Sequence, residues 1–251
     1  MTPEFLTLPN RRLAYQRLIG AANTYNNGPG VVFLGGFASD MTGTKASFLA
    51  ERCKAQGCDY LRFDYRGHGH SGGDFRESTL GDWLEDTLAA FDTLTNGPQI
   101  VVGSSMGGWL ALLLAMQRPE RVKALVGVAA APDFTEDLIW LRLSLAQRTQ
   151  LERDGFIYDE TMPPEEQAPV TLKLIEEARR HLLLHRIIPV TCPVHLLQGM
   201  DDAEVPWQHA LRILENIEHG DVRATFIKDG NHRLSRPQDL AALWRAVGEF
   251  L

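Results

Sequence analysis

The pattern of apolar and polar positions along this 251-residue chain predicts strands that alternate with helices. Short continuous apolar runs, typical of strands buried on both faces, are separated by stretches with helical spacing. The expected strands are Leu13–Ile19, Val31–Leu34, Asp59–Tyr65, Gln99–Val102, Val122–Ala129, Val194–Leu197 and Val222–Ile227. The turn region Asn23–Gly30 is expected to join the first of these strands to its partner. The expected helices are Lys45–Gln56, Leu80–Leu94 behind a Thr79 capping box, Trp109–Met116, one beginning near Pro206, and Gln238–Leu251. The pattern predicts an α/β fold with a mostly parallel central sheet, flanking helices and right-handed crossovers.

This alternation stops in residues 132–189, where the sequence contains no apolar strand. Two stretches there, Leu138–Leu151 and Val170–Leu184, have helical spacing. Between them lies the turn-rich stretch Thr161–Pro164. A crossover between parallel strands needs only about a dozen residues. We therefore expect residues 1–131 and 190–251 to form one core and residues 132–189 to form a helical cap inserted over the carboxyl edge of the sheet. The alternative is one helix with a long loop, although such loops are uncommon in compact domains.

Composition and charge narrow the classes of partner. The formal net charge of −7 argues against nucleic acid and against an anionic membrane surface as partners. No stretch reaches the roughly 20 apolar residues that a membrane span needs, so we expect no integral membrane segment. The three cysteines (Cys53, Cys58 and Cys192) indicate reduced thiols, and Cys53 and Cys58 lack the second pair of ligands that a zinc site needs. The first residues resemble neither a signal peptide nor a transit peptide. We expect a cytoplasmic protein, with the mitochondrial matrix as the alternative for a processed organellar form.

The clearest chemical signal is a β-branched run that ends in Gly103-Ser104-Ser105-Met106-Gly107 and is followed by an apolar helix. Strand, tight turn and helix form the context in which Gly-x-Ser-x-Gly carries a nucleophilic serine. Gly103 and Gly107 would avoid clashes where the chain approaches itself. Ser105 would be strained, with its hydroxyl exposed at a helix N-terminus, where the Met106 N–H would be free to donate to an oxyanion. The alternative is a flexible loop in which small residues cluster.

Two later strand ends carry Asp202 and His232. The chain order Ser105, Asp202, His232 is that of a hydrolase triad, and catalytic groups of open parallel sheets gather at the carboxyl ends of strands. His232 would take the Ser105 proton as base and return it to the leaving group as acid, while Asp202 would hold the imidazole and stabilise its cation. Each of these residues alone is a weak signal, and a histidine after a strand is more often a surface residue. This chemistry needs no metal and no cofactor, and we expect neither.

A second oxyanion donor is expected in the glycine-rich loop after Val31–Leu34. In Gly35-Gly36-Phe37 the glycines would let the backbone approach a ligand, and the Phe37 N–H is the candidate donor. The alternative is a plain glycine turn.

Apolar residues of the expected cap and two tryptophans are candidates for a substrate pocket. Leu138, Trp140, Leu141 and Leu145 would line an acyl pocket, or would form the core of the cap itself. Trp109 and Trp207 follow the catalytic turns and are interpreted either as pocket walls or as packing residues.

One motif competes with this interpretation. Residues 67–72 match G-x-G-x-x-G after a strand, but the loop continues instead of opening a helix. The residue 20 positions beyond Gly72 is Asp92, which lies within an expected helix and not at a strand end. Nucleotide binding is therefore disfavoured. His68 and His70 have no apparent third ligand for a metal site.

The sequence resembles serine α/β-hydrolases in three runs: Phe63–Gly67, Gly103–Trp109 and Asp202–Pro206. Five further runs resemble the family of animal mitochondrial palmitoyl-protein thioesterases, also called mycophenolic acid acyl-glucuronide esterases: Met41–Ala46, Ser78–Gly81, Gly97–Ile100, Cys192–Pro193 and Val205–Trp207. The resemblance covers nearly all of the chain after Val31. It implies an α/β-hydrolase fold with a cap, activity on acyl thioesters and acyl glucuronide esters, and a triad of Ser105, Asp202 and His232. Without the presequence, a bacterial cytoplasmic relative is expected.

We therefore predict a serine esterase or thioesterase that acts through an acyl-enzyme on a small-molecule or acylated substrate, as a monomer or weak homodimer. A C–C bond hydrolase or an acyltransferase would use the same triad. A non-catalytic binding module with this fold is disfavoured, because all three triad residues are present.

Overall fold

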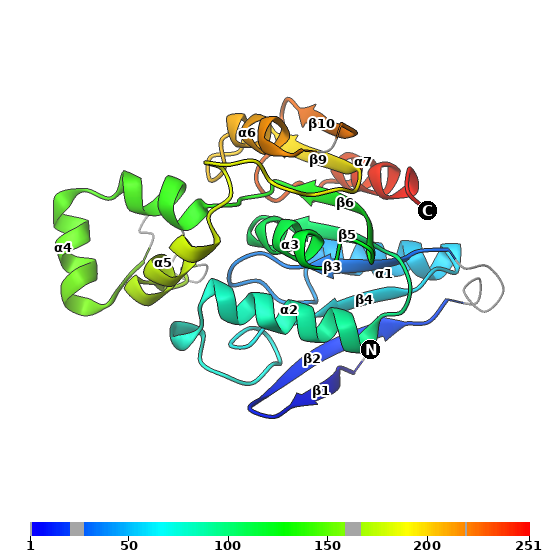
Figure 1. The fold of residues 1–251 in the computed structure, drawn as a ribbon, viewed down its shortest axis with the longest axis horizontal. Helices are drawn as coiled ribbons and strands as arrows, with labels where there is room; N and C mark the ends of the chain where they lie inside the picture. Colours follow the sequence, from blue (N-terminus) through cyan, green and yellow to red (C-terminus); the bar gives the residue numbers. More distant parts are fainter. Residues whose placement is uncertain (1, 21–27, 159–166, 219) are drawn as a thin grey trace.

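The computed structural model describes residues 2–20, 28–158, 167–218 and 220–251. In this part of the chain the central element is an eight-stranded sheet with the order β1-β2-β4-β3-β5-β6-β9-β10 (Figure 1). The strands are β1 (Glu4–Leu8), β2 (Arg11–Leu18), β3 (Gly30–Leu34), β4 (Tyr60–Phe63), β5 (Gln99–Ser104), β6 (Val122–Val128), β9 (Val194–Gly199) and β10 (Val222–Ile227). From β4 to β10 all neighbours are parallel, while β1 and β2 form an antiparallel edge. The predicted α/β class and mostly parallel sheet are confirmed.

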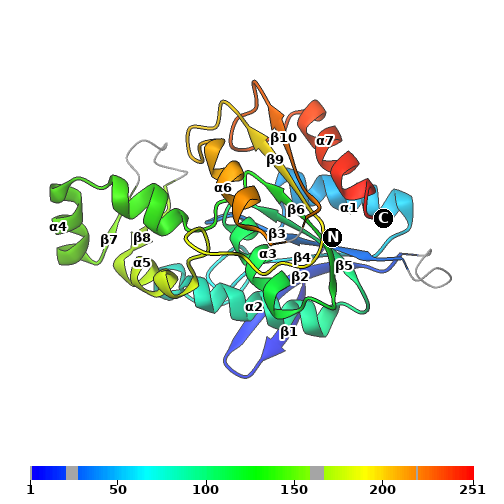
Figure 2. The same ribbon diagram turned by 45° about the horizontal axis from the view of Figure 1, so that its top comes forward.

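Helices cover both faces of the sheet and enclose one apolar core on each side (Figures 1 and 2). One face carries α2 (Leu80–Leu94), α3 (Met106–Gln117) and α6 (Gln208–Asn216). The other face carries α1 (Thr44–Gln56) and α7 (Pro237–Gly248). The expected capping box of α2 is present, because Thr79 and Asp82 cap each other's backbone N–H groups. None of the helices in the described residues combines the length and apolar composition that crossing a bilayer requires.

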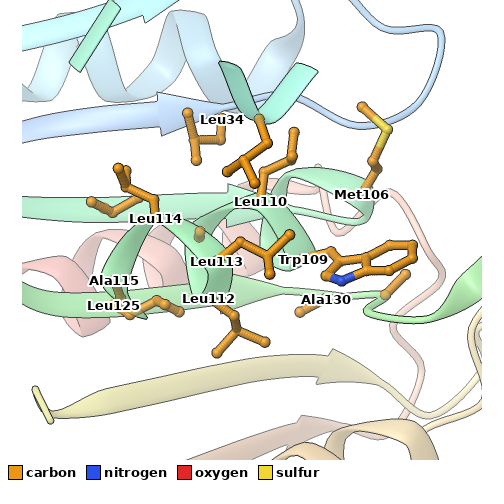
Figure 3. Close-up of a cluster of buried hydrophobic side chains, with 14 of the residues drawn as sticks. Leu34, Met106, Trp109, Leu110, Leu112, Leu113, Leu114, Ala115, Leu125 and Ala130 are labelled. Carbon is orange, nitrogen blue, oxygen red and sulfur yellow. The ribbon is translucent and has the colours of Figure 1, made fainter. Parts of the chain in front are cut away.

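The helix that follows the Gly-x-Ser-x-Gly turn is buried around most of its circumference. Every residue from Met106 to Ala115 is buried, and their side chains project from several sides of α3 (Figure 3). A helix that is apolar all round needs neighbours on all sides. The sheet, α2 and the chain near Leu183 and Ile188 supply them. The turn at the N-terminus of α3 is therefore built on a rigid element.

The outer strands of the sheet differ from the sequence analysis in two respects. β1 was not predicted; it pairs only with β2, and its residues are mostly exposed, so it lacks the apolar pattern of the inner strands. The partner of β2 in the sheet core is β4, not the strand that follows in sequence, because sheet order depends on contacts remote along the chain. The connecting turn predicted at residues 23–30 lies largely outside the described residues. Helix α6 begins at Gln208 with Trp207 as its N-cap, next to Pro206 as predicted.

The described residues between Thr135 and His181 lie beyond the carboxyl ends of the central strands, at one end of the molecule, and the chain then returns along the core to Ile188, which pairs with Ile217 (Figure 1). Their described elements are the π-helical turn Thr135–Ile139, the 3₁₀ turn Trp140–Arg142, α4 (Leu145–Asp154), β7 (Phe156–Ile157), β8 (Val170–Thr171), α5 (Leu172–Ala178) and the 3₁₀ turn Arg179–His181. The expectation that no strand occurs here is wrong, because β7 and β8 form a short antiparallel pair. The predicted helix over 138–151 is broken before α4, where Ser144 and Gln147 form a capping box. The predicted turn at Thr161–Pro164 lies outside the described residues.

Side-chain to backbone hydrogen bonds attach this segment to the core. The buried Asp133 carboxylate accepts the N–H groups of Leu183 and Leu184, and so joins the two ends of the segment. The Trp109 indole N–H donates to the His181 carbonyl over 3.0 Å. The Glu177 carboxylate accepts the Gly81 N–H at 2.9 Å. The segment is thus fixed to the N-terminal ends of α2 and α3, on the side where the parallel strands end.

Candidate active site

Ser105 occupies a strained turn between β5 and α3. Its backbone has φ 54° and ψ −121°, a region that residues with a side chain rarely adopt. A Cβ at Gly103 would lie 2.3 Å from the Gly107 carbonyl oxygen, and one at Gly107 would lie 2.1 Å from the Leu34 carbonyl oxygen. The predicted need for glycine at both positions is confirmed. The turn presents Ser105 next to the loop that follows β3.

The structure brings Ser105, Asp202 and His232 into one hydrogen-bonded chain. The Ser105 Oγ lies 3.1 Å from His232 Nε2, and His232 Nδ1 lies 2.9 Å from Asp202 Oδ2. The three residues follow β5, β9 and β10, whose carboxyl ends lie at one edge of the sheet. Because a carboxylate can only accept, the His232 proton lies on Nδ1 and the Nε2 lone pair faces the serine hydroxyl.

Asp202, and not its neighbour Asp201, faces the imidazole. The Asp202 side chain is fully buried; its Oδ1 accepts the N–H groups of Glu204 and Val205 at 3.0 and 2.8 Å. Its Oδ2 accepts the Gln198 amide N–H at 3.0 Å besides contacting His232. Asp201 is exposed. Sequence reasoning missed Gln198, although a buried-strand position occupied by a polar residue directly after Leu196 and Leu197 was a usable signal.

The loop that carries His232 is tied to α1, which lies with α7 on one face of the sheet. The Lys45 ammonium on α1 donates to the Arg233 carbonyl oxygen. Burial, and next the nearby Arg233 guanidinium, lower the pKa of Lys45 to about 8. Glu204 is the second carboxylate near the imidazole, with Oε2 3.6 Å from His232 Nε2. His232 Nε2 therefore faces the Glu204 carboxylate as well as the Ser105 hydroxyl.

The loop after β3 lies directly against the serine turn. A Cβ at Gly36 would lie 3.3 Å from the Ser105 Cβ, so only glycine permits this approach without a shift. Within the described residues, no hydrogen bond joins the Phe37 N–H to a protein acceptor. Met106 is the first residue of α3, where an N–H has no acceptor within the helix. Both N–H groups thus remain available to a ligand oxygen.

Aromatic rings surround Phe37, an arrangement that sequence reasoning did not identify. The Phe37 ring centroid lies 5.0 Å from that of Phe75, 5.9 Å from Trp83 and 5.8 Å from Phe134. Phe37 also packs against the small apolar cluster inside the 132–189 segment. Beside it an open hollow of about 370 Å³ lies between the loop after β4 and that segment. Its lining includes Ala38, His68, Phe75, Arg76, Tyr158 and Pro169.

Four of the six residues proposed for a substrate pocket have clearly different environments. Trp109 is 0% exposed and packs against Phe134, so it is a core residue in this structure and not an open wall. Trp140 lies within cation–π distance of two arginines, and Leu141 is 61% exposed. Trp207 packs on Phe226 of β10. The four side chains therefore lie in separate local environments, and a role for them in a substrate pocket stays a prediction.

Known proteins similar to this chain include hydrolases and thioesterases. A sequence model described as the alpha/beta hydrolase family matches residues 31–243. Palmitoyl-protein thioesterase ABHD10, mitochondrial, of Mus musculus is 43% identical over 250 residues, which cover 97% of this chain and 80% of that protein. A solved structure from Agrobacterium vitis S4 has a TM-score of 0.91 and 39% identity, covering 99% of this chain and 97% of that one. The structure of alpha/beta hydrolase domain-containing protein 10 from mouse has a TM-score of 0.89 and 38% identity, covering 99% and 98%.

Proposed function

Because the chain belongs to the α/β hydrolase family, we propose that it is a serine hydrolase that cleaves carboxylic esters or thioesters through an acyl-enzyme. The observation that carries this proposal is the unbroken contact from Ser105 Oγ through His232 to the buried Asp202 carboxylate. Similarity to a palmitoyl-protein thioesterase supports acyl hydrolase activity. Asp202 keeps the imidazole in the tautomer whose Nε2 can accept a proton.

Acylation begins when Ser105 Oγ attacks the acyl carbon and His232 Nε2 takes the hydroxyl proton. The carbonyl oxygen becomes an oxyanion, and the Met106 and Phe37 N–H groups donate to it. When the tetrahedral intermediate collapses, the C–O or C–S bond breaks. His232 then returns its proton to the leaving alkoxide or thiolate. The products are the acyl-Ser105 ester and a free alcohol or thiol.

Deacylation repeats these steps with water in place of the serine hydroxyl. His232 removes a proton from water, hydroxide attacks the acyl carbon, and the same two N–H groups stabilise the second oxyanion. The Ser105 oxygen leaves with the proton held by His232, which restores the resting enzyme. Asp202 stabilises the imidazolium in both halves of the reaction.

We further propose that residues 132–189 act as a cap over this site and contribute to binding the acyl group. The segment packs on Phe37 through its own apolar cluster and borders the hollow beside Ala38. The name of the mouse relative states a palmitoyl substrate, which is consistent with a long acyl group. An acyl chain placed here would contribute up to about 0.8 kcal/mol for each methylene removed from water.

The proposal is tested with purified protein and two substrates of matched acyl length, p-nitrophenyl octanoate and octanoyl-coenzyme A. We expect hydrolysis of at least one of them, loss of nearly all turnover in Ser105→Ala, and substantial turnover in the matched control Ser104→Ala. Equal activity of the two variants would remove Ser105 from the mechanism. Binding of the substrates without hydrolysis would support a binding module, and transfer of the acyl group to an added alcohol in preference to water would support an acyltransferase.

A further inference from the structure

His68 is a buried histidine outside the three-residue chain described above. It is 3% exposed, and its ring is packed edge-on by Tyr65, Phe75 and Trp83, with centroid distances of 5.4, 5.0 and 5.2 Å. The residue belongs to the G-x-G-x-x-G stretch after β4, which the proposed function does not use. An aromatic side chain without polar atoms would fill the same space, so packing alone does not account for histidine here.

Both ring nitrogens of His68 have backbone partners, and together these partners define its tautomer. Nδ1 lies 3.2 Å from the Arg66 carbonyl oxygen, which can only accept, so Nδ1 carries the proton. The Ala38 N–H donates to Nε2 over 3.2 Å, so Nε2 is the acceptor. A neutral ring satisfies both contacts. Burial lowers the pKa of His68 to about 4, which keeps the ring neutral near pH 7.

The group that His68 holds lies next to the proposed oxyanion donor. Ala38 follows Phe37 directly and has φ 55°, a left-handed conformation that alanine seldom adopts. Such a conformation persists only where surrounding contacts enforce it. The hydrogen bond to His68 is one such contact, and a second joins the far end of the loop, where the buried Asp64 carboxylate accepts the Met41 N–H at 2.6 Å.

We propose that His68 is a positioning residue: by accepting the Ala38 N–H it fixes the loop after β3, and so keeps the neighbouring Phe37 N–H aimed at the oxyanion formed at Ser105. This inference rests on the proposed serine hydrolase function. The fixed Nε2 lone pair anchors the Phe37–Ala38 peptide, and this anchored peptide constrains the backbone torsions of Phe37. Without the acceptor, the backbone at Phe37 is free to shift, and the oxyanion then loses one well-placed donor.

Three variants separate positioning from packing. His68→Phe keeps a ring in the aromatic cage but removes the acceptor, while His68→Gln offers an amide oxygen to the Ala38 N–H. His70→Phe is the matched control, because His70 lies in the same loop with a side chain that is 54% exposed. We expect kcat to fall about 10²-fold in His68→Phe, the lower range for loss of an oxyanion donor, with KM changed less than about threefold. We expect His68→Gln to recover much of this loss and His70→Phe to remain near wild type.

The inhibition constant of a boronic acid gives a second measurement, which would not change if His68 had a purely structural role. Octylboronic acid forms a tetrahedral adduct whose oxygen occupies the oxyanion position, so its inhibition constant should rise in His68→Phe in parallel with the loss of kcat. An unchanged kcat in His68→Phe, or a loss in KM alone, would overturn the proposal. An unchanged inhibition constant beside a reduced kcat would also overturn it.

Nuclear magnetic resonance of the resting wild-type protein tests the anchor without turnover or mutation. With ¹⁵N-labelled histidine and alanine, we expect a proton on His68 Nδ1, none on Nε2, and a coupling across the hydrogen bond between Ala38 N and Nε2. A proton on Nε2 would contradict the anchor. The proposed function is tested separately, by activity. It would fail if the wild-type protein were no more active than Ser105→Ala, and this outcome does not depend on the spectrum.

Discussion

The His232 imidazole and the Asp202 carboxylate are in contact, with Nδ1 2.9 Å from Oδ2, although 30 positions separate them along the chain. We expect Asp202→Asn to lower kcat by about 10⁴, the loss seen for the equivalent change in a serine protease, because an amide can stabilise the wrong imidazole tautomer. Steady-state kinetics on a chromogenic ester measure the effect.

Asp201→Asn is the matched control for this change, because Asp201 is the adjacent carboxylate and is exposed. It should keep kcat within about threefold of wild type, as expected for a surface position. A larger loss from Asp201→Asn than from Asp202→Asn would reverse the assignment of the acid.

Gly107 should tolerate no side chain. A Cβ there would lie 2.1 Å from the Leu34 carbonyl oxygen, so Gly107→Ala must displace either the serine turn or β3. We expect a loss of about 3–5 kcal/mol in the free energy of unfolding, in the range of severe core substitutions. Urea denaturation followed by circular dichroism gives the value.

The control for Gly107 is Gly248 at the end of α7, where an added Cβ meets no atom within 4 Å. Gly248→Ala should be neutral or stabilise by up to about 1 kcal/mol, because alanine favours the helix. If both variants unfold at the same urea concentration as wild type, the close packing of the serine turn is refuted.

The sequence predicted what local pattern and chain order determine. β3 and β5 were recognisable because their residues are apolar on both faces, and Ser105 because strand, glycines and helix are contiguous in sequence. β1 was missed because an exposed edge strand has no such pattern. The break before α4 was missed although Ser144 and Gln147 carried its capping signal.

The supporting residues of the site depend on contacts that a single sequence does not reveal. The hydrogen bond from Gln198 to Asp202 could be predicted only from the path of the loop after β9. The bond between His68 and Ala38 needs two loops on neighbouring strands to meet. Pattern reasoning placed Trp109 beside the serine turn correctly, but whether its side chain faces a substrate or the core depends on how the 132–189 segment covers it.

His68 should make stability depend on pH. Burial lowers its pKa to about 4, below the value of about 6.5 for an unfolded chain. Between these values only the unfolded state binds a proton at this site. The contribution of neutral His68 to the free energy of unfolding is therefore complete above about pH 6.5. It is lost as the pH falls toward 4, and the total loss is about 3 kcal/mol.

The comparison of wild type with His68→Phe isolates this effect, because His209, whose pKa is also lowered by burial, is present in both proteins. The free energy of unfolding should fall more steeply in wild type than in the variant between about pH 6.5 and 4.5. Parallel pH dependence in the two proteins would show that His68 titrates alike in the folded and unfolded states.

Acyl length should govern catalytic efficiency. If the 132–189 segment covers the acyl group, each methylene that it removes from water should multiply kcat/KM by a factor of up to about four. We expect this increase from acetyl to about octanoyl. Efficiencies for p-nitrophenyl esters and matching thioesters of increasing length give the profile. A steady decline from acetyl onward would show that the segment closes the site to long chains.

A covalent probe decides whether Ser105 attacks the acyl group. The wild-type protein is incubated with a fluorophosphonate, digested, and the modified peptide is sequenced by mass spectrometry, with Ser104→Ala and Ser105→Ala treated in parallel. The contact of 3.1 Å between Ser105 Oγ and His232 Nε2 predicts one adduct on Ser105, retained in Ser104→Ala and absent from Ser105→Ala. An adduct on Ser104, or labelling that persists in Ser105→Ala, would contradict the mechanism.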